Sequence, residues 1–99
     1  MEDLYIHKND SIKLVIERSS FSIFANIDFR DANPSEPTLK KYADIYRQLL
    51  LELNFSPISE QPGLMLFVHK DKNPSAFSNL SKLKETLDEQ IMTMERDYV

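Results

Sequence analysis

The N-terminal third of the chain alternates between apolar and polar side chains in three runs separated by short polar turns. Residues 12–17 place their isoleucines and leucine on one side, and residues 21–29 show this period of two most clearly. Such a period indicates strands that are buried on one face. Residues 4–7 alternate more weakly, which is typical of an edge strand. Three sequential strands with short turns predict an antiparallel meander.

Two longer segments follow the helical period instead. From Leu39 to Leu53 the apolar residues recur every three or four positions, and at about 100° per residue they form one stripe. This spacing predicts an amphipathic helix that ends near Asn54. The same spacing from Phe77 to Tyr98 predicts a second helix that continues to the C-terminus.

A short apolar run, 64–68, separates the two helical segments. It is apolar on both sides, which is typical of a fully buried strand, whereas the proline-containing segment 56–63 before it predicts a loop. The helix before that loop fits a right-handed crossover, so this strand is expected to lie parallel to strand 21–29. The order β-β-β-α-β-α then predicts an α+β fold, a two-layer α/β sandwich. In it, an antiparallel meander plus one parallel strand form a four-stranded sheet with both helices on one face.

Composition narrows the class of protein further. The 99 residues predict one globular domain, 1–99. The chain has no cysteine, which excludes disulfides and thiolate metal sites, and its single glycine is too few for a phosphate-binding loop. Its net charge of −4 disfavours nucleic-acid binding. Because no apolar run is long enough for a membrane span and the N-terminus does not resemble a secretory signal, we expect a cytoplasmic protein without a membrane partner.

The sequence contains no recognisable catalytic motif. The serines lack the Gly-x-Ser-x-Gly context of a nucleophile elbow. His7 and His69 lack a third ligand and make a poor zinc site, and histidines at strand ends are expected to be solvated. Tyr42 and Tyr46 lie one turn apart on the apolar stripe and are expected in the core. The sequence therefore predicts no enzyme activity, no metal and no cofactor.

The pattern Asp-x-Asn-Pro-Ser occurs twice, at 31–35 and 71–75, each time between a strand and a helix. The simplest interpretation is a helix start, with Ser35 and Ser75 as N-caps. If the two strands are parallel, both loops share one sheet edge, where helix N-termini favour an anion or a small ligand. Oxygen side chains in the loops also suit Mg²⁺ or Ca²⁺, but neither loop has the glycine and glutamate of an EF-hand. The candidate ligand-binding residues are Arg30, Asp31, Asn33, Lys70, Asp71 and Asn73.

The predicted sheet has a second face that helices on one side leave uncovered. Val15 and Phe24 point to this face by their place in the alternation. One set from the run 64–68 joins them, either Met65 with Phe67 or the set Leu64, Leu66 and Val68. An apolar patch of this kind often marks an interface; the alternative is that a helix or the N-terminal segment covers it.

The predicted helices carry two further signs of a partner. Leu51 and Met92 lie off their apolar stripes and are expected to be exposed. Acidic residues gather late in the second helix, where they oppose the helix dipole, so something other than helix stability is expected to place them there. They would attract a basic protein; the alternative is a solvated face with lysine–glutamate pairing. These acidic residues are Asp88, Glu89, Glu95 and Asp97.

Taken together, the sequence predicts a small, acidic, non-catalytic protein-binding module with a basic protein partner. By general analogy, the concrete hypothesis is an inhibitor of the immunity-protein or antitoxin kind that blocks a nuclease toxin. One alternative is a structural or adaptor subunit that homodimerises through the open sheet face. The other is a sensor of small ligands or anions that uses the two Asp-x-Asn-Pro-Ser loops.

Overall fold

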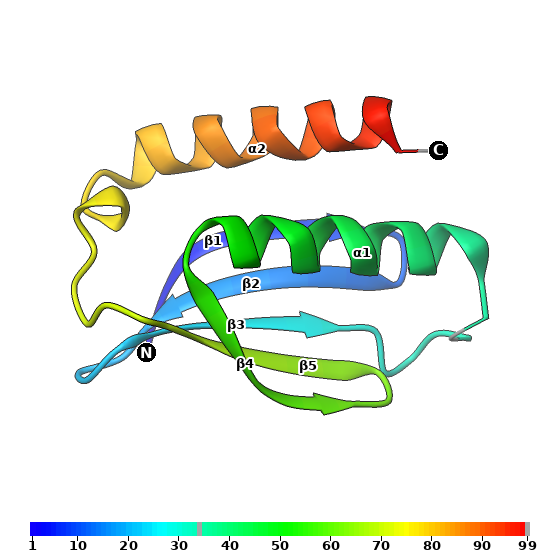
Figure 1. Cartoon of the computed structure of the whole chain (residues 1–99), viewed down its shortest axis with the longest axis horizontal. Coiled ribbons are helices and arrows are strands. Elements are labelled where there is room, and N and C mark those ends of the chain that lie inside the picture. The colour runs from blue at the N-terminus through cyan, green and yellow to red at the C-terminus, as the bar shows by residue number, and fades with distance from the viewer. Residues whose placement is uncertain (34, 99) are drawn as a thin grey trace.

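A computed structural model describes residues 1–33 and 35–98, so Pro34 of the first repeated motif lies outside the described part. The fold is α+β, with five strands and two α-helices (Figure 1). The elements are β1 (Glu2–Asn9), β2 (Ile12–Arg18), β3 (Ile23–Asp28), α1 (Pro37–Glu52), β4 (Phe55–Gln61), β5 (Leu64–His69), a 3₁₀ turn (Ser75–Phe77) and α2 (Leu80–Asp97). Neither of these helices is both long and apolar enough to cross a membrane.

The five strands form one sheet in the order β1-β2-β3-β5-β4, and each neighbouring pair is antiparallel. The predicted meander of the first three strands is confirmed, with β1 at one edge. The predicted four-stranded sheet with a parallel strand is wrong, because a fifth strand lies between α1 and the apolar run 64–68. The chain leaves α1, runs along the far edge as β4 and turns back, so β5 lies antiparallel to β3.

The missed strand β4 contains the residues that predict a loop. Phe55 is buried and begins the strand, but Pro57 follows at an irregularity in the pairing with β5. A proline lacks the N–H of a central strand but is compatible with an edge strand such as β4. Pro62 and Gly63 form the turn to β5. Two prolines that indicate a loop therefore stand at an edge and in a hairpin turn.

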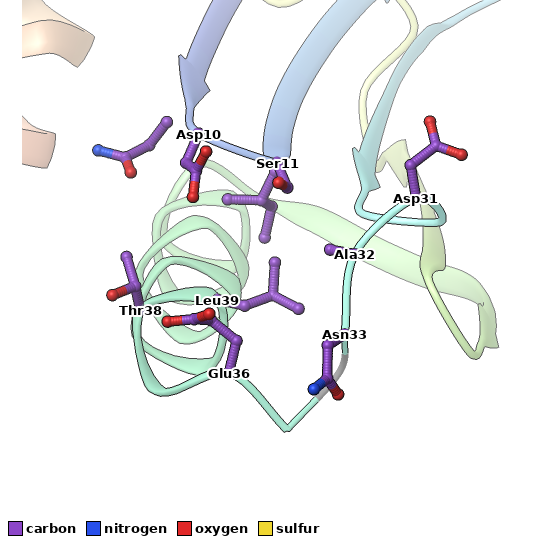
Figure 2. A pocket seen from close by; sticks show the side chains of 10 residues that line it. Asp10, Ser11, Asp31, Ala32, Asn33, Glu36, Thr38 and Leu39 are labelled. Carbon is purple, nitrogen blue, oxygen red and sulfur yellow. The ribbon is translucent and has the colours of Figure 1, made fainter.

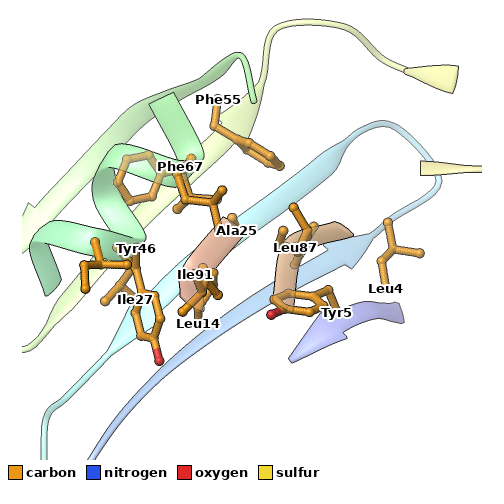
Figure 3. Packing of buried hydrophobic residues seen from close by; sticks show 14 of the residues in the cluster. Leu4, Tyr5, Leu14, Ala25, Ile27, Tyr46, Phe55, Phe67, Leu87 and Ile91 are labelled. Carbon is orange, nitrogen blue, oxygen red and sulfur yellow. The ribbon is translucent and has the colours of Figure 1, made fainter. Parts of the chain in front are cut away.

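The core lies between one face of the sheet and the two helices (Figure 3). Alternate residues of β2, β3 and β5 form the sheet side of the core, and the apolar stripes of α1 and α2 pack against them from the helix side. Leu87 and Ile91 of α2 lie above Leu14 and Tyr5 in Figure 3. Tyr42 and Tyr46 are buried in this core, as predicted. The helices thus leave the opposite face of the sheet without a layer over it in the described part of the chain.

The helix starts differ from the expected ones. Ser35 does not cap α1; its N–H and hydroxyl both donate to Oδ1 of Asn33, at 3.1 and 2.7 Å. Ser75 opens the short 3₁₀ turn that buries Phe77, and α2 is capped by Asn79, whose Oδ1 accepts from the Lys82 N–H at 3.1 Å. Both N-cap predictions are wrong, because asparagine side chains organise these segments.

Gly63 provides a test of the β4–β5 turn. It has φ +85°, and a Cβ there would lie 3.0 Å from Cα of Arg30. We expect Gly63→Ala to lower the free energy of unfolding by about 1–3 kcal/mol, since both backbone strain and a backbone contact oppose the methyl group. Chemical denaturation measures the change. Gln61→Ala, at the exposed end of β4, is the control and should stay within about 0.5 kcal/mol.

Candidate protein-binding site

Six apolar side chains lie on the face of the sheet opposite the helices. The register of β5 against β3 decides which set of the run 64–68 belongs there: Phe24 pairs with Val68, and Ala25 of the core pairs with Phe67. Phe67 therefore joins the core, as does the partly buried Met65. The open sheet face, as we name it, consists of Ile6, Val15, Phe24, Leu64, Leu66 and Val68.

Polar groups on the open sheet face carry both signs of charge. Glu17 accepts a hydrogen bond from the Asn26 side chain at 3.1 Å. Lys13 stands opposite Asp28 across the β2–β3 pair. Both carboxylate oxygens of Asp28 accept hydrogen bonds from the Arg30 guanidinium, Oδ2 from Nη2 at 2.8 Å and Oδ1 from Nε at 3.1 Å. The hydrogen bond from Arg30 is the main cause that lowers the pKa of Asp28. These pairs leave the face mixed in charge rather than acidic.

The acidic residues of α2 divide into two pairs with different positions. Oδ1 of Asp88 accepts from the hydroxyl of Tyr5 on β1 at 2.7 Å, and Glu95 accepts from the hydroxyl of Tyr42 on α1. Glu89 and Asp97 are exposed to solvent. Half of the predicted acidic patch is thus engaged in holding α2 to the rest of the fold.

The eight predicted partner-binding residues do not form one surface. Val15 and Phe24 lie on the open sheet face, whereas the other six belong to the helix layer on the opposite side of the sheet. Leu51 and Met92 are exposed, with 39% and 62% of their surface accessible, as their helical positions predict. A single compact partner can therefore contact one of these sets but not both.

A layer of aromatic and polar side chains joins β1 to both helices, and sequence reasoning missed it. Nδ1 of His7 and the hydroxyl of Tyr46 share a hydrogen bond of 2.8 Å, and their rings meet edge to face with centroids 5.6 Å apart. Burial is the main cause that raises the pKa of Tyr42 to about 12, and Glu95 adds to it. The sequence signal that could have predicted this layer is the spacing of Tyr5 and His7, which lie two positions apart and therefore on the same side of β1.

The six predicted ligand-binding residues fall into two groups at opposite ends of the sheet. Because β3 and β5 are antiparallel, the loop after β3 lies beside the β4–β5 turn, where Arg30 packs against Gly63. Lys70 follows the other end of β5, and its N–H donates to the carbonyl of Asn54 at 3.0 Å. The shared edge on which the ligand hypothesis depends is not formed.

The two histidines also have different environments from the expected ones. His69 is buried, with Phe55 and Phe77 edge to face against its ring at 4.9 and 5.6 Å. Its Nδ1 accepts a hydrogen bond from the Asp71 N–H at 2.9 Å. His69 is therefore a core residue that fixes the second repeated loop, and it is not solvated.

A polar pocket lies where the β1–β2 turn, the β3–α1 loop and the start of α1 meet (Figure 2). Asp10, Asp31 and Glu36 contribute carboxylates to its lining, and Asn33 contributes an amide. Within residues 1–33 and 35–98, no group of three or more histidine, cysteine or acidic residues is arranged to hold a metal ion. The pocket unites residues of the first repeated motif only, without those of the second.

Comparisons with protein-family models, with curated proteins and with solved structures gave no match.

The contact between Tyr5 and Asp88 can be measured as a coupling. Hydrogen bonds to charged groups are stronger than neutral ones. However, 39% of the Asp88 side chain is exposed, and its other oxygen, Oδ2, forms an ion pair with Nζ of Lys84 at 3.0 Å. We expect a double-mutant cycle of Tyr5→Phe and Asp88→Asn to give a coupling of about 1 kcal/mol in unfolding free energy. The matched pair Tyr5→Phe and Glu89→Gln should be additive. Additivity in both cycles would contradict the anchoring role of Asp88.

His7 predicts a dependence of stability on pH. Burial lowers its pKa, although Asp88 and Glu95 of α2 oppose this and Lys84 assists it. Tyr5 of β1 and Tyr46 of α1 are its neutral neighbours. Because the folded chain accepts this proton less readily than the unfolded chain, stability should fall as the pH drops through about 6.5 and level off below the folded pKa.

The measurement for His7 is urea denaturation between about pH 8 and pH 5. In His7→Gln, which keeps a polar side chain beside Tyr46, the loss of stability over this range should be smaller than in the wild type. An identical loss in the two proteins would show that another group is responsible.

Proposed function

We propose that the protein is a non-catalytic protein-binding module that docks a basic partner protein on its open sheet face. The observation that carries the proposal is the set of apolar side chains on this face, among which Asn26 lies between Val15 and Leu66. Its six apolar side chains come from β1, β2, β3 and β5, with no helix over them in the described part of the chain. Ile6 is exposed and Phe24, Leu64, Leu66 and Val68 are partly exposed, whereas Val15 has 8% of its surface accessible. An apolar patch of this kind often marks an interface.

The dimensions of the open sheet face fit a protein interface. Four strands about 4.8 Å apart, each contributing side chains along about 13 Å, give with the side-chain width an area of roughly 400 Å². This area is the footprint of the whole face and includes the polar Lys13, Glu17, Asn26 and Asp28 as well as the apolar side chains. A standard interface takes roughly 800 Å² from each partner, so docking here would also involve residues beside this footprint.

The charge of the chain supports a basic partner. The net charge of −4 and the exposed Glu89 and Asp97 give a field that speeds association with a positively charged protein. These two residues belong to the helix layer, so they act by steering rather than by contact. Their effect is expected to weaken as salt shortens the screening length to about 8 Å. An inhibitor that blocks a basic enzyme, such as a nuclease toxin, is the concrete form of this function.

The mixed charge of the open sheet face favours a second candidate, a homodimer. Lys8 and Lys13 stand on the same face as Glu17 and Asp28. A two-fold axis brings the same patch of both copies together, so a patch with both signs can pair with itself. Light scattering with size-exclusion chromatography distinguishes this candidate. A concentration-dependent dimer that Phe24→Asp dissolves would favour it over a separate partner.

The test of the proposed function compares variants of the two layers. Immobilised wild-type protein should retain a basic protein from a lysate of the source cells, and the identified protein is then titrated with each variant. Phe24→Asp and Leu66→Asp should weaken binding by more than about tenfold, because each places a charge in the apolar contact.

Leu51→Asp, on the exposed side of α1, is the matched control and should bind as the wild type does. Glu89→Lys should reduce the association rate at low salt while leaving the contact intact. Circular dichroism confirms that each variant is folded. Equal binding by Phe24→Asp and the wild type would remove the open sheet face from the proposal.

A further inference from the structure

The edge of the sheet at β1 carries unpaired backbone groups. β1 pairs with β2 on one side, and it is the first strand in the sheet order. A two-residue turn, Asp10–Ser11, joins the strands, and Asn9 pairs with Ile12 beside it. In such a hairpin the pair next to the turn exchanges both hydrogen bonds, and every second pair does the same.

This alternation fixes the direction of each backbone group of β1. Asn9, His7 and Tyr5 direct their N–H and C=O groups toward β2. Ile6 and Lys8 therefore direct theirs away from the sheet, where the described residues offer them no backbone partner. A row of outward N–H and C=O groups is a template for one more strand.

A groove runs beside this edge, between β1 and the first turns of α2. Asp3, Leu4, Tyr5 and Ile6 line it on the β1 side, and α2 contributes Leu80, Ser81 and Lys84. Leu80 of the groove has 38% of its surface accessible, whereas the side chain of Ile6, 51% accessible, lies on the open sheet face. The groove thus offers apolar contacts directly next to the unpaired backbone.

A row of α2 side chains continues from Lys84 of the groove toward the C-terminal end of the helix. Lys84, Asp88 and Met92 follow one another at intervals of four residues, so they form a row that turns by about 40° at each step around the helix. Asp88 bonds to Tyr5, which directs this row toward β1. Met92, at the far end of this row, is exposed and lies outside the core cluster.

The position of α2 limits what can add to the edge. In Figure 1, α2 lies beyond β1, on the side away from β2. A second copy that pairs its own β1 with this one brings its own α2 to the same side of the joined sheet. The two α2 helices would then compete for one space, so the edge admits a single extended segment more readily than a second sheet.

We infer that the edge of β1 and the groove beside α2 bind an extended segment of a partner protein as a sixth strand. Its side chains alternate: one set enters the groove near Leu80 and the other lies beside Ile6 on the open sheet face. The preferred segment has apolar residues at alternate positions and a basic residue near the exposed Asp3. This inference shares only Ile6 with docking on the open sheet face, so either can fail while the other stands.

A phage-displayed library of short random linear peptides, panned against the full chain, supplies the probe. Enriched peptides are expected to show apolar residues at alternate positions, and synthetic copies are titrated by fluorescence anisotropy. Ile6→Pro removes one outward N–H without removing a bond to β2, and it should weaken binding at least about tenfold. Ile6→Val keeps this N–H and is the matched control.

Two further variants separate the edge from the open sheet face. Leu80→Asp should weaken the same peptides, whereas Phe24→Asp, on a strand away from the edge, should leave them bound. The inference is overturned if no peptide is enriched, or if Ile6→Pro and Ile6→Val bind the peptides equally well. It is also overturned if Phe24→Asp abolishes binding while Leu80→Asp does not.

Amide hydrogen exchange on the wild-type protein tests the inference without any substitution. In the free protein the N–H groups of Ile6 and Lys8 should exchange faster than those of Tyr5 and His7. An enriched peptide should slow exchange at Ile6 and Lys8 selectively. Protection without peptide, together with a dimer in light scattering, would assign the edge to a second copy and overturn the inference.

Discussion

The packing of two helices on one face of an antiparallel sheet is the constraint on which the other features depend. Every strand has two faces, and two helices in one layer bury only one of them. Ile12, Leu14 and Ile16 of β2 therefore lie in the core, while Val15 of the same strand lies on the opposite side. The open sheet face is the direct consequence of a chain that has no helix left to cover it in its described part.

The attachment of α2 is the second element of this constraint. Leu83, Leu87 and Ile91 bury the apolar stripe of α2, but this stripe lies near the β1 edge rather than over the middle of the sheet. Polar contacts with Tyr5 and Tyr42 then fix how the helix is rotated. In this orientation Met92 is exposed to solvent. Acidic residues late in α2 thus oppose the helix dipole at least partly for a structural reason.

Periodicity identifies both helices, the first three strands and the apolar strand 64–68, but not the strand β4 or the pairing that depends on it. Strict alternation in residues 12–17 and the helical stripe from Leu39 identify β2 and α1, because burial of one face or one stripe imposes those periods. The same reasoning does not identify β4, because Pro57 indicates a loop unless the strand is already known to lie at the edge of the sheet. Once β4 is missed, the direction of β5 reverses, and the two repeated motifs are placed at the same end of the sheet instead of at opposite ends.

The candidate surfaces also divide into residues that local periodicity places correctly and residues whose position depends on distant contacts. Alternation alone predicts that Val15 and Phe24 lie on the uncovered face, whereas the choice of Leu64, Leu66 and Val68 requires the register against β3. The inward direction of Asp88 could not be predicted, because its partner Tyr5 lies 83 positions away in the sequence. Local periodicity predicts which side of its own element a residue occupies. It does not predict which distant side chain meets it there.

Ile6 connects the two proposed binding modes. It faces the open sheet face beside Val15, and its backbone groups point outward from the β1 edge. A strand added at that edge would place half of its own side chains next to Ile6 and widen the open sheet face by about 4.8 Å. The first contact would then enlarge the surface for the second. A partner with an extended basic segment next to a folded apolar patch could use both, and the linkage would raise its affinity through the high effective concentration of the second contact.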